Sequence, residues 1–425
     1  MWLGDYWVIV GGMALFFIPG LLLIALTAYP QLLGMDGGFN TDALLSSLLA
    51  LYPLGSGAII SVVNVFGAKQ YHPVLQSSFL EQYFITFYLC INIGSLLGGF
   101  IVPSVAKYSN IFAAYMIPVV ASILVLITFL AMTKRYIRMK PNGKVMVDSL
   151  KVMFGSLLCW SSHRHSNQES TKPMLKPAMP GLEKLKESSG GRYEDSFVES
   201  VRRLLYVIPV SALVMPFTIV FNQLSTVFIT QGEVMRPAGP FDAALMQNFG
   251  PISVILSGLL ASRVIYPALS KRGIHLAITT KFAIGCSFAT LAIAAALIIE
   301  YRIRAVYQAT GEPISIIWQT FSFVFVGCGE MFSISSSIEA TYVIAPKPNK
   351  GLASAINDFL TMGTSSFIAA ALYNACRSFF TNDAGTTDLG TLELYNQAEV
   401  YSYWFVMLAI GAFGILLNSF PPIKR

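Results

Sequence analysis

One acidic residue stands in the middle of a long apolar stretch of the sequence. Glu330 is preceded by Phe323–Phe325 and followed by Met331–Phe332. An ionisable group at the centre of a membrane-spanning helix costs at least about 2.5 kcal/mol. We therefore expect Glu330 to face a polar cavity, where a carboxyl can bind a cationic group or exchange a proton. A carboxyl that is satisfied structurally by a neighbouring helix is the alternative.

A second acidic residue, Glu339, follows nine positions later. Nine steps of about 100° place it about half a turn from Glu330, so one cavity does not easily hold both carboxyls. We interpret Glu339 as a packing or gate residue that pairs with a basic group, either Arg263 or Lys281. Tyr342, three residues further on, is assigned to the same gate or structural group.

Polar side chains also recur inside two other apolar stretches. Tyr88, Asn92 and Ser95 are separated by steps of four and three residues, so they share one face of a helix. Asn222 and Gln223 are adjacent amides, and burying them unpaired would cost on the order of a few kcal/mol. We predict that these five residues line a substrate path. Hydrogen bonding between helices is the alternative for both groups.

Groups suited to catalysis or metal binding are sparse. The chain has four histidines, none inside an apolar stretch, and five cysteines without a paired spacing. His163-Arg164-His165 lies in a polar segment and is read as a solvated loop. We therefore predict no metal, no cofactor and no disulfide framework. A membrane-embedded enzyme is a disfavoured alternative, because such enzymes usually carry His, Asp or Cys constellations at the membrane boundary.

The elements that hold these residues are predicted to be transmembrane helices. Hydrophobic residues make up 55% of the 425-residue chain and charged residues only 12%, which is typical of a membrane protein. Crossing the hydrocarbon core of a bilayer takes about 20 mostly apolar residues. Ten stretches qualify: Tyr6–Ala28, Ala43–Phe66, Gln82–Val102, Ile111–Met132, Leu204–Thr230, Phe241–Leu269, Leu276–Glu300, Ile314–Ala345, Leu352–Phe379 and Tyr401–Phe420.

The basic residues indicate how the helices are oriented. Most lie in alternate connections, which contain Lys69, residues 134–203, Lys271-Arg272, Lys347 and Lys350, and Lys424-Arg425. Because basic loops are retained on the cytosolic side, we predict that both termini are cytosolic. The net charge of +6 is then an orientation signal, and we predict no nucleic-acid partner. The choice between plasma and vacuolar membrane stays open.

The long polar segment divides the spans into four before it and six after it. Major-facilitator transporters have two six-helix halves, with the substrate site at mid-membrane between them. We therefore predict an all-α membrane protein with a major-facilitator-type bundle; an unrelated ten-helix fold is the alternative. The predicted domains are an incomplete N-terminal bundle (1–132), a cytosolic linker (133–200) and a C-terminal six-helix bundle (201–425). Within the linker, Lys144–Trp160 has the spacing of an interfacial helix.

Ordered motifs along the chain resemble those of the proton-dependent oligopeptide transporter (peptide/nitrate transporter) family. The family patterns are a GTGGIKP opening with an FGADQF close, FYxxINxGSL, VxYP and WQ…GE…LExxYxxAP. The corresponding segments here are Gly55–Ile59 with Phe66–Tyr71, Phe87–Leu96, Val264–Pro267 and Trp318–Pro346. Phe221–Thr226 is similar to the seventh-helix pattern of the plant and fungal branches.

The resemblance implies a secondary active transporter for di- and tripeptides or related small solutes such as nitrate. It would be proton-coupled, work by alternating access and act as a monomer in the lipid bilayer. The family's matching glutamate, here Glu330, binds the peptide amino end or couples to a lysine in the fourth helix. The four-plus-six division further implies that the first two helices of the family are missing.

Two features depart from the family pattern. The fourth-helix lysine falls on Ile60, and Lys69 lies nine residues further on, about 13 Å along a helix. Lys69 therefore cannot replace that lysine at the same depth. The family's glutamate-rich proton-coupling motif belongs to the first helix, which we expect to be absent. A degenerate or truncated family member that does not transport is accordingly the alternative function.

Overall fold

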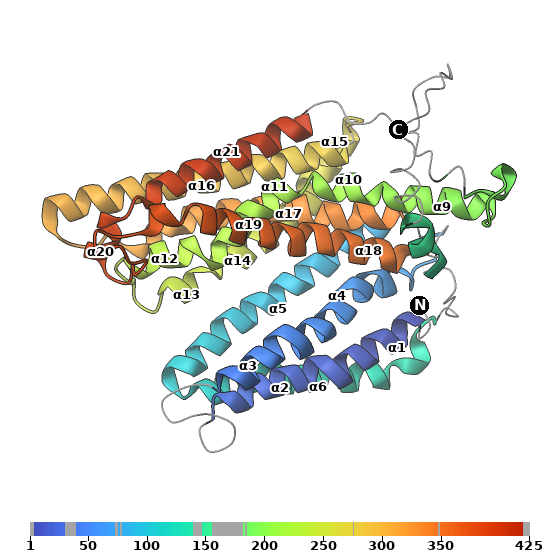
Figure 1. Ribbon diagram of the computed structural model, residues 1–425, viewed down its shortest axis with the longest axis horizontal. Coiled ribbons are helices and arrows are strands. Elements are labelled where there is room, and N and C mark those ends of the chain that lie inside the picture. The colour runs from blue at the N-terminus through green and yellow to red at the C-terminus, as the bar shows by residue number, and fades with distance from the viewer. Residues whose placement is uncertain are drawn as a thin grey trace.

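The fold is built from helices throughout the described part of the chain (Figure 1). The computed structural model describes residues 4–29, 40–72, 75–76, 79–138, 147–154, 182, 185–274, 276–346 and 349–419. Within these ranges the only extended pairings are three isolated β-bridges. The predicted all-α class is therefore confirmed.

Four long helices form the N-terminal half, and two of them contain a π-helical segment. Gly55 lets the first two pack closely, because a Cβ there would lie 2.4 Å from the backbone nitrogen of Phe17. The segments of these helices are α1 (Gly4–Gly11), η1 (Gly12–Phe17) and α2 (Ile18–Thr27); α3 (Thr41–Ser46), η2 (Ser47–Leu51) and α4 (Tyr52–Ala68); α5 (Leu80–Tyr108); and α6 (Ile111–Ala131).

The C-terminal half begins with a bent pair of helices, which change direction by 47°. The bent pair comprises α9 (Asp195–Leu205), α10 (Val207–Ala212), α11 (Met215–Phe221), η6 (Asn222–Ser225) and α12 (Val227–Glu233). The remaining segments are α13 (Ala243–Met246), α14 (Phe249–Leu260), η7 (Ala261–Ile265), α15 (Tyr266–Lys271), α16 (Ile278–Thr310), η8 (Ile316–Gln319), α17 (Thr320–Ile344), α18 (Lys350–Asp358), η10 (Phe359–Thr364), α19 (Ser365–Ala375), η11 (Arg377–Phe380), α20 (Leu392–Gln397) and α21 (Val400–Ser419).

The number of apolar helices is smaller than predicted. Among the described residues, eight are long and apolar enough to cross a membrane, or nine if the bent pair is one span. The predicted span Leu352–Phe379 is helical from Lys350 to Ala375 but is not one of the eight or nine. Its polar residues explain the difference, since Asn357 and Asp358 stand next to each other in its first third.

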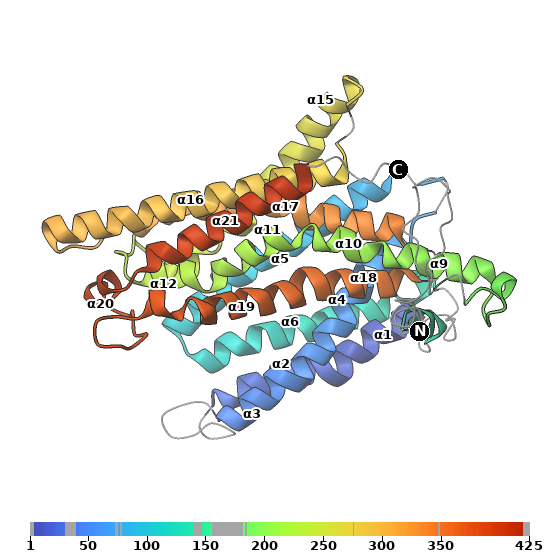
Figure 2. The same ribbon diagram turned by 45° about the horizontal axis from the view of Figure 1, so that its top comes forward.

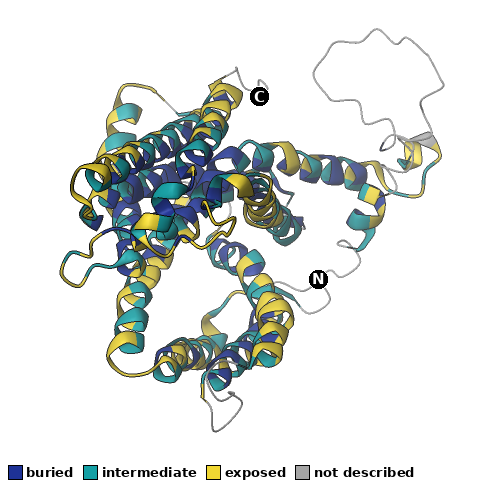
Figure 3. Cartoon of the chain, turned by 60° about the vertical axis from the view of Figure 1, so that its left-hand side comes forward, coloured by how far each residue is buried: buried dark blue, intermediate teal, exposed yellow. Residues whose placement is uncertain are grey.

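The core lies mainly in the C-terminal half, where α17 is the most buried long helix. In the most apolar part of each helix, 72% of the residues are buried in α17 but only 11% in α6. Small residues allow this packing: a Cβ at Gly285 of α16 would lie 2.9 Å from the carbonyl oxygen of Gly329 in α17. Figure 3 shows the buried residues gathered in one group of helices.

The two halves meet along α4 and α5. In Figures 1 and 2 the helices α1–α6 lie together beside the C-terminal helices. The carbonyl oxygen of Gly99 in α5 accepts a hydrogen bond from Asn248 Nδ2 (3.0 Å). Further along the same helix, Lys107 forms an ion pair of 3.8 Å with Asp242. Contacts between the halves therefore extend to the C-terminal end of α5.

The linker is described only in part. Residues 147–154 are helical, as expected for part of Lys144–Trp160. Val152 is fully buried in a cluster with Val198 and Val201 of α9, so this helix packs on the chain itself. The rest of the predicted helix, and the triplet at 163–165, lie outside the described residues.

Candidate functional site

The two halves are joined at mid-span by a hydrogen bond to Glu330. The hydroxyl of Tyr88 in α5 donates to Oε1 of Glu330 in α17. Glu330 is 9% exposed and Tyr88 7%. A hydroxyl that donates to a carboxylate forms a charge-assisted bond, which is stronger than one between neutral groups. A carboxyl that is satisfied by a neighbouring helix was the alternative to a cavity-facing carboxyl. Glu330 has such a partner, and it belongs to the other half of the molecule.

The position that the family lysine would occupy contributes no charge here. Ile60 of α4 is 57% exposed and apolar. Lys69, which follows the end of α4, instead binds Asp5 at 2.5 Å. The partner of Glu330 in this structure is therefore a tyrosine hydroxyl from α5, where the family resemblance implies a lysine from the preceding helix.

The polar stripe on α5 is buried along one part and exposed along another. Asn92 is 4% exposed and donates to the carbonyl oxygen of Tyr88 (3.0 Å). Ser95 is exposed, although the spacing puts it on the same face of the helix. The helix face that packs Tyr88 against the C-terminal half is thus exposed one turn beyond Asn92, at Ser95.

Asn222 and Gln223 bind groups within the C-terminal half. Asn222 Oδ1 accepts a hydrogen bond from Ser366 Oγ of α19 (3.0 Å). Gln223 is 2% exposed, and its Oε1 accepts from the hydroxyl of Tyr403 in α21 (3.0 Å). These contacts are the helix-to-helix hydrogen bonds of the alternative interpretation. A role for either amide in lining a substrate path stays a prediction.

The second carboxyl of α17 faces a different helix. Lys281 Nζ of α16 lies 3.3 Å from Glu339 Oε2, and Arg263, the other basic residue considered, is exposed in η7. Glu330 and Glu339 therefore bind α5 and α16 respectively, in agreement with their predicted separation by half a turn. Both α16 and α17 belong to the C-terminal half, so this pair fastens helices of one bundle together.

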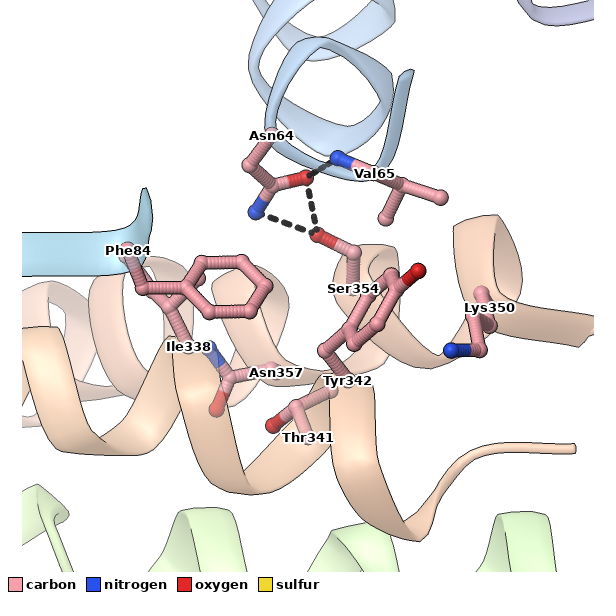
Figure 4. Close-up of a pocket in the computed structure, with 9 residues that line it drawn as sticks. All are labelled: Asn64, Val65, Phe84, Ile338, Thr341, Tyr342, Lys350, Ser354 and Asn357. Atoms are coloured by element: carbon pink, nitrogen blue, oxygen red, sulfur yellow. Dashed lines mark hydrogen bonds between the residues drawn. The ribbon is translucent and has the colours of Figure 1, made fainter. Parts of the chain in front are cut away.

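A small pocket of about 10 Å³ lies where α4 and α5 meet α17 and α18 (Figure 4). This volume is about that of one water site. Asn64 Nδ2 of α4 donates to Ser354 Oγ of α18 (3.1 Å), and Lys350 Nζ lies 3.2 Å from the ring centre of Tyr342. The lining residues are Asn64, Val65, Phe84, Ile338, Thr341, Tyr342, Lys350, Ser354 and Asn357. The two halves are closed against each other at this end.

A buried charged cluster at the other end of the C-terminal half was missed by sequence reasoning. Glu300 has no exposed surface and binds Arg304 Nε (3.3 Å), the hydroxyl of Tyr395 (2.7 Å) and Gln231 Nε2 (3.0 Å). Glu300 is the last residue of the predicted span Leu276–Glu300. The signal that could have revealed it is Arg304 four residues later, the spacing of a helical ion pair.

The chain is similar to transporters by sequence and by structure. The model of PTR2, the POT family, matches residues 6–388. Protein NRT1/PTR FAMILY 8.3 of Arabidopsis thaliana is 26% identical over 455 aligned residues, which cover 95% of this chain and 77% of that relative. A probable peptide transporter, ptr2 of Schizosaccharomyces pombe, is 25% identical over 383 residues, covering 83% of this chain and 58% of the relative.

Solved structures share the fold. An auto-inhibited POT family peptide transporter has a TM-score of 0.66 at 22% identity, with 97% of this chain and 81% of the other covered. A POT family transporter in complex with 5-aminolevulinic acid has a TM-score of 0.62 at 17% identity, with 98% and 80% covered.

Proposed function

This chain belongs to the POT family, and from that membership we propose that it is a secondary active transporter working by alternating access. The proposed substrates are di- and tripeptides or related small solutes, and protons are the proposed coupling ions. Relatives named as a peptide transporter and as solute carriers support this substrate class. The chain is an integral multi-pass membrane protein. We further propose that it acts as a monomer with both termini in the cytosol.

The observation that carries the proposal is the hydrogen bond between Tyr88 and Glu330. Alternating access requires that contacts between the halves break and form again during each cycle. A carboxyl that accepts a hydrogen bond across the junction loses its partner when the halves separate. It then has to bind something else, since an unpaired ionised group is costly at that depth. A peptide amino group or a proton satisfies this requirement.

The remaining contacts between the halves suit a gate. Asn64 and Ser354 join α4 to α18 at the end that we propose to be cytosolic. Each such hydrogen bond is worth only about 1 kcal/mol, so the contact is weak enough to open. The Lys281–Glu339 pair lies within one half, which supports a packing role for Glu339. Tyr342 lines the pocket and is the better gate residue of the two.

A family member that does not transport is the second candidate. The exposed Ile60 favours it, because it leaves the family's lysine position without a charge. In that case Tyr88 and Glu330 would hold the halves together permanently.

Uptake by the full chain in liposomes tests the proposal. We expect radiolabelled dialanine to accumulate when the outside is more acidic, and Glu330→Gln to abolish this accumulation. Glu312→Gln is the matched control, because Glu312 is exposed between α16 and η8, and it should accumulate dialanine like the wild type. If Glu330→Gln accumulated as much dialanine as the wild type, the proposed role of Glu330 would be contradicted. A wild type that transports no di- or tripeptide and no nitrate would favour the second candidate.

A further inference from the structure

Another carboxyl, that of Asp358, lies where the helix from Lys350 to Ala375 changes its winding. Asp358 is the last residue of α18, and the π-helical segment η10 begins at the next residue. Its Oδ2 atom is buried and has no hydrogen-bond partner among the described residues. Burying a carboxylate oxygen without a hydrogen bond is costly, and short π-helical segments inside helices often occur at functional sites.

The neighbours of Asp358 place it at the junction of the two halves. Ser354, one turn earlier, accepts a hydrogen bond from Asn64 of α4. A spacing of four residues puts Asp358 on the same face of α18 as Ser354. The adjacent Asn357 Oδ1 accepts from Ser211 Oγ (2.8 Å) and Ser337 Oγ (2.6 Å), which fixes α18 against α10 and α17. Ser354 and Asn357 both line the pocket in Figure 4.

No cation is available to Asp358 from the described residues. No Lys or Arg among them forms an ion pair with it. The elements packed against α18 and η10 are α4, α10, α11, α17 and α19, and none of them carries a Lys or Arg. The titratable groups on these elements and on α18 itself are Tyr52, Cys328, Glu330, Glu339, Tyr342, Lys350 and Tyr373.

The charged members of this set have other partners. Glu330 binds Tyr88 and Glu339 binds Lys281, while Lys350 lies over the ring of Tyr342. Lys350 is also eight residues before Asp358, about 12 Å along the helix. A metal cation would need several oxygen ligands, and the described residues hold no cluster of three acidic or metal-ligating side chains. The environment therefore suits a neutral carboxylic acid.

We propose that Asp358 is a proton-binding site that is loaded while α4 is packed against α18. The proton comes from bulk water and returns to it when the Asn64–Ser354 contact opens and water reaches Oδ2. This inference deepens the proposed function, on which it rests, by naming a coupling group within this chain. Asp358 would then supply a titratable group that does not depend on a lysine at position 60.

Infrared difference spectroscopy on the purified full chain in lipid tests the site without any transport. We expect a pH-dependent carboxylic acid band that shifts in heavy water and disappears in Asp358→Asn. Asp383→Asn, in an exposed loop, is the matched control and should keep the band. An identical band in wild type and Asp358→Asn would overturn the proposal. So would a band that is lost only when sodium replaces potassium, because the ligand would then be sodium.

Transport measurements test the role of the site. In liposomes, Asp358→Asn should lose the accumulation of dialanine driven by a proton gradient but keep the exchange of internal for external dialanine. Exchange survives because the amide imitates the permanently loaded acid. Accumulation at the wild-type level would overturn the coupling role. If the wild type moves no dialanine, the proposed function fails, while the infrared band still decides whether Asp358 binds a proton.

Discussion

The two most buried of the long apolar helices belong to the C-terminal half, and the two least buried belong to the N-terminal half. In the most apolar parts of α16 and α17, 44% and 72% of residues are buried, against 17% and 11% in α5 and α6. Of the buried residues in the largest hydrophobic cluster, only Ile85 and Tyr88 come from the N-terminal half. The C-terminal half thus contains the densely packed core, and the N-terminal half contacts it mainly through α4 and α5.

The ion pairs differ in the same direction, although the hydrogen bonds of Tyr88 with Glu330 and of Asn64 with Ser354 are buried between the halves. Inside the C-terminal half, Glu300 is completely buried and has three side-chain partners. Between the halves, Lys107 and Asp242 form an exposed pair at 3.8 Å. Contacts that hold a scaffold together are expected to be costly to break, whereas contacts that open in a transport cycle are expected to be weak. This difference can be tested with matched substitutions.

The largest effect is expected at the buried charged cluster. Arg304→Met should lower the free energy of unfolding by about 3 kcal/mol or more, because it leaves Glu300 charged and buried without its cation. Lys107→Met, the control in the exposed pair, should cost less than about 1 kcal/mol. The destabilisation of both variants is measured by thermal unfolding of the purified proteins, with size-exclusion chromatography as the readout of the folded fraction. Equal unfolding temperatures for Arg304→Met and Lys107→Met would show that the buried cluster contributes no more to stability than the exposed pair.

A smaller effect is expected where α16 and α17 cross. Gly285→Ala should destabilise the protein by about 1–3 kcal/mol, because the new methyl group would meet the Gly329 carbonyl oxygen and Ser333. Gly94→Ala in α5 meets nothing within 4 Å and should be neutral or stabilising by up to about 1 kcal/mol. The same melting experiment applies. A Gly94→Ala variant as unstable as Gly285→Ala would show that α5 is packed as tightly as the C-terminal core.

The smallest effect concerns the contact between the halves. Asn64→Ala removes a hydrogen bond worth about 1 kcal/mol, which should raise the population of the open arrangement about fivefold. The measurement is the rate at which a water-soluble maleimide labels Thr341→Cys in the pocket, with the native cysteines replaced. Ser56→Ala removes only a hydrogen bond to the Pro53 carbonyl oxygen within the same helix and should leave the rate unchanged. A rate unaffected by Asn64→Ala would mean that this contact does not hold the gate.

Spacing within one helix could be predicted well from the sequence. The half-turn between Glu330 and Glu339 follows from helical geometry alone, and the structure accordingly directs them to α5 and α16. Lys281 was one of two partners expected for Glu339. The four-plus-six grouping of helices, which rests on apolar runs and a single polar segment, stays a prediction.

Contacts between distant helices could not be predicted in the same way. Tyr88 and Glu330 are 242 residues apart, and only the packing of α5 against α17 brings them together. Asp358 was overlooked because Leu352–Phe379 was judged by its average apolarity, which conceals two adjacent polar residues. Ser95 shares its helical face with Tyr88, yet the two differ in exposure because the C-terminal half covers only part of α5.

The central claim is that Tyr88 and Glu330 act as one unit at the junction of the halves. A double-mutant cycle in the thermal stability of the purified full chain tests it most directly, using Tyr88→Phe, Glu330→Gln and the double variant. If the two side chains act through their mutual hydrogen bond, the double variant will unfold at about the same temperature as Glu330→Gln alone. Losses of stability that add independently in the double variant would contradict the account.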